Sequence, residues 1–303
     1  MSKLGAYVAL SRPFTLLPPV LGFVSGSITA WGAGQVRPEV TSDVVQRVVY
    51  GTLMAGTLNA ASNALNQIYD VAIDRVNKPR RPLPSGALSI AEAWGFALLA
   101  YLLAWWLASL VAPAGRHECL WIVLVASLIT WAYSAPPLRT KRRGIWANVT
   151  IAIPRGVLLK VAGWSAVKTV IGVEPWYIGS IFGLFLLGAA STKDFADIDG
   201  DRADGCQTLP IRYGLRQAAW IISPFFVLPF LLIPIGVLCG VLTGNRGLLL
   251  VLGPLLLLYG AYTAYLLVRR PEELAVTENH ISWTHMYLMM MVAQVGFAVA
   301  YVL

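Results

Sequence analysis

The sequence has few charged residues and no polar stretch long enough to form a soluble domain. Charged residues make up 13% of its 303 residues, whereas hydrophobic residues make up 57%. A soluble domain carries about 25% charged residues, so this composition excludes a soluble protein as the bulk of the chain. Cysteine is also scarce, and Cys119, Cys206 and Cys239 lack the spacing of a metal site or a redox pair. Most of the protein's surface is therefore expected to contact lipid.

Nine apolar runs have about the length needed to cross the hydrocarbon core of a membrane, roughly 17 to 25 helical residues. The alternation typical of a membrane β-barrel is absent, and the first run lacks the cleavage site of a signal peptide. We predict an all-α, polytopic membrane protein with a single transmembrane domain over residues 1–303. The predicted spans are Phe14–Trp31, Val48–Ile68, Trp94–Ala112, Leu120–Ala135, Ile145–Trp164, Trp176–Ala190, Ala218–Leu242, Leu248–Val268 and Ile281–Val302.

Lysine and arginine are distributed unequally between the two predicted sides of the membrane. One side, which includes the amino terminus, carries 16 of the 23 basic residues. The positive-inside rule therefore predicts a multi-pass protein of the cell membrane whose amino terminus and basic loops are cytoplasmic. This distribution also accounts for the net charge of +8 without a nucleic-acid partner. The basic residues on the other side are Arg37, Arg47, Arg116, Lys168 and Arg246.

Aspartate is concentrated in two short stretches at the cytoplasmic ends of the second and sixth predicted helices. Seven of the eight aspartates lie there, and Asp43 is the exception. Spacings of three and four residues place side chains on one face of a helix, and Asp199 lies off that face. The predicted faces are Asn66, Asp70 and Asp74 in the first stretch and Asp194, Asp197 and Asp201 in the second.

Two such carboxylate faces indicate a magnesium site. Like charges at these spacings repel by a few tenths of a kcal/mol per pair, so packing alone gives no reason to collect them. Mg²⁺ takes oxygen ligands and is typically held by one or two carboxylates together with phosphate oxygens of a substrate. Two facing acidic ridges therefore predict a metal clamp for a diphosphate. For either cluster alone, the alternative is a solvated helix end whose aspartates pair with neighbouring arginines.

Basic residues near the two stretches are candidates for binding the diphosphate. Arginine can grip a phosphate with two parallel hydrogen bonds. For each residue there is a strong alternative, namely that it does not contact substrate, since cytoplasmic loops are basic in any membrane protein. The candidates are Arg81, Arg139, Lys141, Lys193 and Arg202.

Arg155 and Lys160 lie within the fifth predicted span. An ionisable group inside a span is a functional candidate by default, although both side chains could instead extend toward the membrane surface. If they face a cavity, they are suited to bind an anionic acceptor.

In this combination and order, the residues resemble the UbiA superfamily of intramembrane prenyltransferases over nearly the whole chain. Gln67 departs from the family pattern, in which an aspartate commonly follows the first asparagine. The stretch from Asn66 to Gly86 looks closest to the branch that contains chlorophyll synthases and archaeal digeranylgeranylglyceryl phosphate synthases. The matching motifs are Asn66, Asp70 and Asp74 with Asn77 to Gly86, Tyr133 to Arg139 with Lys141, and Lys193 to Pro210.

The resemblance implies a nine-helix bundle around a central cavity that opens sideways to lipid. Two Mg²⁺ ions would bridge an isoprenyl diphosphate, such as geranylgeranyl diphosphate, to both acidic motifs, whose aspartates would be catalytic. Loss of diphosphate would leave an allylic carbocation for a membrane-associated acceptor to capture. Tyr133, Arg155 and Lys160 are the candidate acceptor-binding residues. The two basic residues favour geranylgeranylglyceryl phosphate as the acceptor, while an aromatic quinone precursor and chlorophyllide stay open.

Two rival functions use similar residues. A magnesium or organic-anion transporter could use an acidic cavity, but transporters tend to place charged sites near the midplane on broken helices. A membrane CDP-alcohol phosphotransferase also uses paired aspartates, but its motif is not reproduced around Asp199 and Gly200. Magnesium-dependent release of diphosphate would distinguish a transferase from a transporter.

Overall fold

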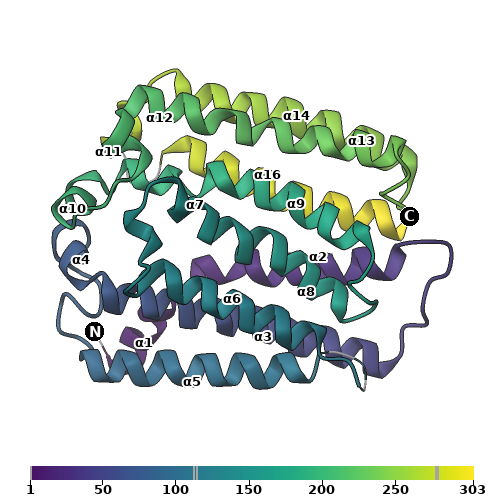
Figure 1. The fold of residues 1–303 in the computed structure, drawn as a ribbon, viewed down its shortest axis with the longest axis horizontal. Coiled ribbons are helices and arrows are strands. Elements are labelled where there is room, and N and C mark those ends of the chain that lie inside the picture. The colour runs from purple at the N-terminus through teal and green to yellow at the C-terminus, as the bar shows by residue number, and fades with distance from the viewer. Residues whose placement is uncertain (1, 112, 114, 277–279) are drawn as a thin grey trace.

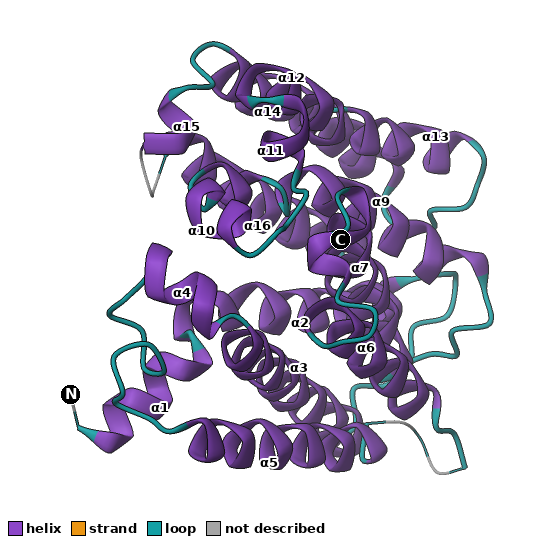
Figure 2. Cartoon of the chain, turned by 60° about the vertical axis from the view of Figure 1, so that its left-hand side comes forward, coloured by secondary structure: helices purple, strands orange, loops and turns teal. Residues whose placement is uncertain are grey.

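The computed structural model describes residues 2–111, 113, 115–276 and 280–303, and these residues form helices and loops without a strand (Figure 2). Short 3₁₀ turns link several of the helices, and a π-helical segment, Ile153–Leu158, joins α7 to α8. The α-helices are α1 (Lys3–Ser11), α2 (Leu17–Gly32), α3 (Ser42–Tyr69), α4 (Val71–Asn77), α5 (Ile90–Ser109), α6 (Glu118–Ser134), α7 (Ile145–Ala152), α8 (Leu159–Ser165), α9 (Val173–Ala189), α10 (Ile198–Ala203), α11 (Leu209–Tyr213), α12 (Leu215–Ile222), α13 (Leu232–Leu238), α14 (Arg246–Val268), α15 (Glu273–Val276) and α16 (Ile281–Val302).

Among the described residues, seven helical stretches are long and apolar enough to cross a membrane, so the all-α membrane fold is confirmed but the predicted number of nine spans is not. The two other predicted spans are helices that differ in kind. Helix α6 is apolar but has only 17 residues. Helix α3 has 28 residues but is too polar to be counted. The seven stretches are Pro13–Gly32, Ile90–Ser109, Ile145–Ser165, Val173–Phe195, Leu215–Leu238, Arg246–Val268 and Ile281–Val302.

The polar residues of α3 hold the start of the chain in place. The side-chain amide of Asn63 donates to the Ser11 carbonyl at 2.9 Å, and that of Gln67 donates to the Leu10 carbonyl at 2.8 Å. These bonds satisfy backbone carbonyls at the end of α1, which otherwise would lack partners. They fix the turn at Arg12, whose φ of 54° lies in the left-handed region.

Small residues let the helices approach closely at the centre of the bundle. A Cβ atom on Gly163 of α8 would lie 2.3 Å from the Phe23 carbonyl oxygen of α2. A Cβ atom on Gly156 would lie 2.5 Å from the Cα atom of Gly183 in α9. Such small-residue contacts are typical of helix packing in membranes.

The two ends of the bundle differ in structure. Helices α4, α10 and α11 gather at one end together with the amino terminus, and the carboxyl terminus lies at the other end (Figure 1). We call the end that carries α4 and α10 the carboxylate end, because it holds both aspartate-rich stretches.

Candidate active site

The first aspartate-rich stretch lies where one helix ends and the next begins. Helix α3 ends at Tyr69 and α4 begins at Val71, so Asp70 occupies the junction. The Asp70 amide still donates to the Asn66 carbonyl, and the Asp74 amide donates to the Asp70 carbonyl. The four-residue spacing is therefore kept across the junction. Asp70 and Asp74 are each only 3% exposed.

The second stretch is not the continuous helical ridge that the spacing predicts. A 3₁₀ turn, Thr192–Phe195, carries Asp194, and α10 begins only at Ile198. Asp194 and Asp201 are buried, Asp197 is partly buried, and Asp199 is exposed, as its off-face position predicts.

A contact between α4 and α10 brings the two stretches together. The Asn77 side-chain amide donates to the Asp197 carbonyl at 3.1 Å and accepts from the Gly200 amide at 3.0 Å. Position 200 has no room for a side chain, since a Cβ atom there would lie 2.4 Å from Nδ2 of Asn77. The hydrogen bonds of the Asn77 side chain to the backbone of α10 therefore hold the two motifs next to each other.

Lysine and arginine side chains neutralise the gathered carboxylates. Lys141 joins the two stretches, because its Nζ lies 2.6 Å from Oδ2 of Asp70 and 3.6 Å from Oδ1 of Asp201. Buried carboxylates need such partners, since an unpaired charge in the interior is costly. The other pairs are Arg81 with Asp74 at 2.5 Å, Lys193 with Asp194 at 2.9 Å, and Lys78 with Asp197 at 3.2 Å.

Arg139 contacts the first stretch from outside the polar cavity. Its guanidinium lies 3.1 Å from Asp204 and 3.6 Å from Asp70, and it donates to the Tyr69 carbonyl at 3.0 Å. Asp204 also pairs with Arg142 at 2.6 Å. Arg139 thus contacts a candidate metal ligand, although it is not among the residues that line the cavity described below.

Burial and neighbouring charges shift the pKa values of two groups in this cluster. Burial raises the pKa of Asp201 to about 6, against the opposing effect of Lys141 and Lys193. Burial alone would lower the pKa of Lys141, but the Asp70 carboxylate, with Tyr133 and Asp201, raises it. Lys141 is therefore positively charged at neutral pH.

A polar cavity of about 290 Å³ opens between the two stretches. Asp194 and Asp201 are not among its lining residues; they lie behind Lys193 and Lys141, with which they pair. The predicted site residues that line this polar cavity are Asn66, Asp70, Asp74, Arg81, Tyr133, Lys141, Arg155, Lys193 and Asp197.

The residues around the polar cavity fit a magnesium ion that shares its ligands with a substrate. Oδ1 of Asp70 and Oδ2 of Asp74 are buried without a hydrogen-bond donor, although the Arg139 guanidinium lies 3.6 Å from Oδ1 of Asp70. Both oxygens could therefore serve as ligands to a metal ion. Within the described part of the chain, no three His, Cys, Asp or Glu side chains gather closely enough to hold a metal by themselves. This pattern suits Mg²⁺, which commonly completes its shell with water and phosphate oxygens.

The predicted acceptor-binding residues separate in the structure. Arg155 lies in the π-helical segment after Pro154, lines the polar cavity and makes no hydrogen bond or ion pair with the described residues. Tyr133 also lines this cavity and accepts a hydrogen bond from Lys193 at 3.4 Å. Lys160, in contrast, points toward α2, where its Nζ donates to Ser25 Oγ at 2.8 Å.

Lys160 and Arg202 therefore join Arg139, Asp194 and Asp201 as predicted residues that do not line the polar cavity. Lys160 is 2% exposed and sits 4.5 Å from the ring centroid of Phe182, so packing of α8 against α2 and α9 takes it away from the polar cavity. Arg202 follows Asp201 directly on α10, and because neighbouring side chains diverge around a helix, it is exposed to the outside.

Sequence reasoning missed Arg12. Its side chain lines the polar cavity, and its Nε and one terminal nitrogen are buried without a partner. Arg12 is one of the 16 basic residues on the predicted cytoplasmic side, and no site role is predicted for it. Its position directly before Pro13 was the available signal, because a proline at the start of a helix marks a fixed turn.

The fold and the cavity together define a multi-pass membrane protein. At one end of its helical bundle lies a polar cavity lined by aspartate, lysine and arginine side chains. The model of the UbiA prenyltransferase family matches residues 16–285. The chain therefore belongs to this family.

Relatives of known name agree with this assignment. A digeranylgeranylglyceryl phosphate synthase from Methanobrevibacter smithii is 27% identical over 301 residues, which cover 97% of this chain and 96% of that protein. A chloroplastic chlorophyll synthase from Oryza sativa subsp. japonica is 30% identical over 222 residues, which cover 70% of this chain and 56% of that protein. The chain thus spans little more than half the length of the chlorophyll synthases that it matches.

A solved structure has the same fold. It is that of a UbiA homologue from Archaeoglobus fulgidus bound to DMAPP and Mg²⁺, with a TM-score of 0.75 and 24% sequence identity. The match covers 98% of this chain and 100% of that one.

Proposed function

We propose that this protein transfers a prenyl group from an isoprenyl diphosphate, such as geranylgeranyl diphosphate, to a membrane-associated acceptor in a magnesium-dependent reaction. The proposal includes two Mg²⁺ ions in one active site and a single catalytic domain over residues 1–303. It also includes a cytoplasmic orientation of the carboxylate end, which the distribution of basic residues favours.

One observation carries the proposal: Lys141 contacts an aspartate from each of the two stretches, Asp70 and Asp201. A single cation between the two motifs supports the proposal that both act on the same bound group. Divalent cations are suited to such a place, because they offer more charge to two carboxylates than one ammonium group does.

The ion pairs indicate how the residues act when substrate enters. Each candidate metal-binding aspartate pairs with a cation that is itself suited to bind phosphate. When a magnesium–diphosphate complex enters, we propose that the carboxylates turn to the metal and the cations turn to the phosphate oxygens. The residues proposed to hold metal are Asn66, Asp70, Asp74, Asp194, Asp197 and Asp201, and those proposed for diphosphate are Arg81, Arg139, Lys141 and Lys193.

Charge development explains why this arrangement favours the reaction. Bound Mg²⁺ would stabilise the negative charge that develops on the leaving diphosphate. Lys141, Lys193 and Arg81 add fixed positive charges on the same side. The aromatic rings of Tyr133, Trp283 and Tyr287 also line the polar cavity and can stabilise an allylic cation through their π faces.

The acceptor that we favour is geranylgeranylglyceryl phosphate. Arg155 supports it, because this unpaired guanidinium lines the polar cavity apart from the carboxylate ion pairs, and Arg12 adds unpaired donors to the same cavity. The relative from Methanobrevibacter smithii also bears the name of an enzyme for that acceptor. The chlorophyll synthases support the alternative, an acceptor such as chlorophyllide or another ring compound.

The test uses purified full-length protein in detergent with labelled geranylgeranyl diphosphate. Geranylgeranylglyceryl phosphate, an aromatic quinone precursor and chlorophyllide are supplied separately, with Mg²⁺ or with EDTA. We expect magnesium-dependent release of diphosphate and a labelled product with the phosphate-bearing lipid. Product formed only with a ring acceptor would overturn the acceptor assignment. Binding of the diphosphate without any turnover would instead favour a transporter.

A further inference from the structure

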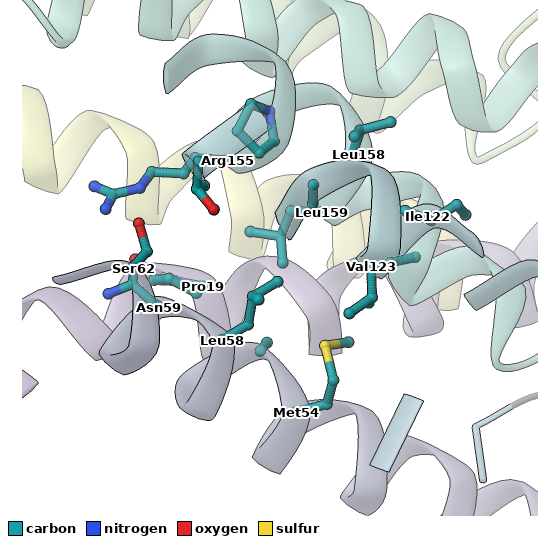
Figure 3. A pocket seen from close by; sticks show the side chains of 15 residues that line it. Pro19, Met54, Leu58, Asn59, Ser62, Ile122, Val123, Arg155, Leu158 and Leu159 are labelled. Carbon is teal, nitrogen blue, oxygen red and sulfur yellow. The ribbon is translucent and has the colours of Figure 1, made fainter. Parts of the chain in front are cut away.

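Two further cavities adjoin the polar cavity in different directions, and they meet at Arg155. The first, which we call the α3–α6 cavity, runs between α3, α6 and α8 (Figure 3). The second, the α9–α16 cavity, runs between α2, α9 and α16. Arg155 lines both of them as well as the polar cavity.

The α3–α6 cavity is built in layers, because three neighbouring helices each contribute a residue about every turn. Figure 3 shows Ser62 and Arg155 at one end and Met54, Ile122 and Val123 at the other. Ser62 and Met54 are eight residues apart on α3, so the cavity is about 12 Å deep at a rise of about 1.5 Å per residue. The layers, from the mouth inward, are Ser62, Thr130 and Arg155, then Leu58, Ala126 and Leu158, then Met54, Ile122 and Ala162.

Below its mouth, this cavity is suited to a hydrocarbon chain. Its middle and deep layers are apolar, and its floor belongs to a buried cluster that includes Met54 and Val123. The alanines at positions 126 and 162 are among the smallest side chains that line it. The mouth is shared with the polar cavity through Ser62, Thr130 and Arg155.

The α9–α16 cavity is less suited to a pure hydrocarbon. Gln294, which is 5% exposed, lines it, and its Oε1 is buried without a donor. A hydrocarbon chain beside this amide would leave it unpaired, which is costly in an apolar environment. A ligand with a polar atom fits better there.

We propose that the α3–α6 cavity holds the prenyl chain of the donor and that its layers set the longest chain the enzyme accepts. The proposal rests on the prenyl-transfer function proposed above and adds the residues that determine donor chain length. Ala126 limits the chain in the middle layer, Ala162 limits it one layer deeper, and Met54 closes the floor.

The experiment measures kcat/KM of the full-length protein for dimethylallyl and geranylgeranyl diphosphate with the same acceptor. A dimethylallyl group is too short to pass the mouth, so it reports whether the catalytic centre is intact. We expect Ala126→Phe to lower the ratio of geranylgeranyl to dimethylallyl kcat/KM by at least about tenfold, the size of effect that a change in a hydrophobic pocket produces. Ala162→Leu should lower this ratio less, and Met54→Ala should raise activity with a donor one isoprene unit longer.

Two variants are matched controls. Leu128→Phe adds bulk to α6 on a side chain that is 70% exposed, and Met290→Trp fills the α9–α16 cavity. Neither should change the ratio by more than about twofold. An unchanged ratio in Ala126→Phe and Ala162→Leu, or a lower ratio in Met290→Trp, would overturn the proposal. Failure of the prenyl-transfer function itself would differ, since the unaltered protein would then release no diphosphate from either donor.

Discussion

Lys141 offers a sharp test of how the two acidic stretches are held together. Its Nζ contacts Asp70 at 2.6 Å and Asp201 at 3.6 Å, and the residue is 7% exposed. Lys141→Met removes the cation and leaves two carboxylates in a buried site. Breaking a buried pair by removing one partner costs about 3–5 kcal/mol. We therefore expect the free energy of unfolding, measured in detergent with EDTA at neutral pH, to fall by about that amount.

Arg142 provides the control, because it is a neighbouring cation in a different setting. Its side chain is 41% exposed and pairs with Asp204 at 2.6 Å. Exposed pairs contribute about 0–1 kcal/mol, so Arg142→Met should cost no more than that. Adding Mg²⁺ and a non-reactive prenyl diphosphate should restore part of the stability of Lys141→Met, since a divalent cation can take the place of the lysine. Equal losses in the two variants would refute this account of the cluster.

Three further predictions follow from the same site. Because burial raises the pKa of Asp201 to about 6 from an ordinary 3.8, its ionisation destabilises the fold as pH rises through about 6. In EDTA, the free energy of unfolding of Asp201→Asn should therefore exceed that of the unaltered protein by up to about 3 kcal/mol at pH 8, and the difference should be gone below about pH 4. An equal difference at both pH values would contradict this. Gly200→Ala should weaken both stability and activity, because its Cβ atom would meet the Asn77 amide. The control is Gly95→Ala at an exposed position of α5, where a Cβ atom has open space, so this variant should be neutral or stabilising. Equal effects of the two variants on thermal unfolding would argue against the α4–α10 contact. Arg155→Met should raise the KM of a phosphate-bearing acceptor about 10-fold to 100-fold, as expected for a lost hydrogen bond to a charged group, without a similar rise for the diphosphate donor; the reverse pattern would place Arg155 on the donor.

Much of the site could be predicted because its signals are local or chemical. The four-residue spacing of Asn66, Asp70 and Asp74 survives the helix junction, since the backbone hydrogen bonds continue across it. The preference of Mg²⁺ for carboxylate oxygens was the reason to predict that the second stretch lies near the first. The structure brings Asp197 of that stretch to the same cavity.

The remaining features depend on tertiary packing that spacing does not encode. The direction of the Lys160 side chain depends on how α8 packs against α2. The two helices approach closely at Gly163, and Lys160 points toward Ser25 and away from the polar cavity. The break between Asp194 and α10 is likewise set by contacts outside the stretch, such as that between Asn77 and Gly200. The predicted number of nine spans is not confirmed, since the amides of α3 that hold the amino-terminal turn make this helix polar.

The central claim is that both acidic stretches bind one metal–diphosphate complex. A double-mutant cycle with Asp74→Asn and Asp197→Asn tests it directly, because these aspartates line the same cavity from different stretches. The measured quantity is the Kd of a non-reactive geranylgeranyl thiodiphosphate in the presence of Mg²⁺. If one complex contacts both residues, the two effects on binding free energy should depart from additivity by more than about 0.5 kcal/mol. Effects that add within that limit would contradict the claim.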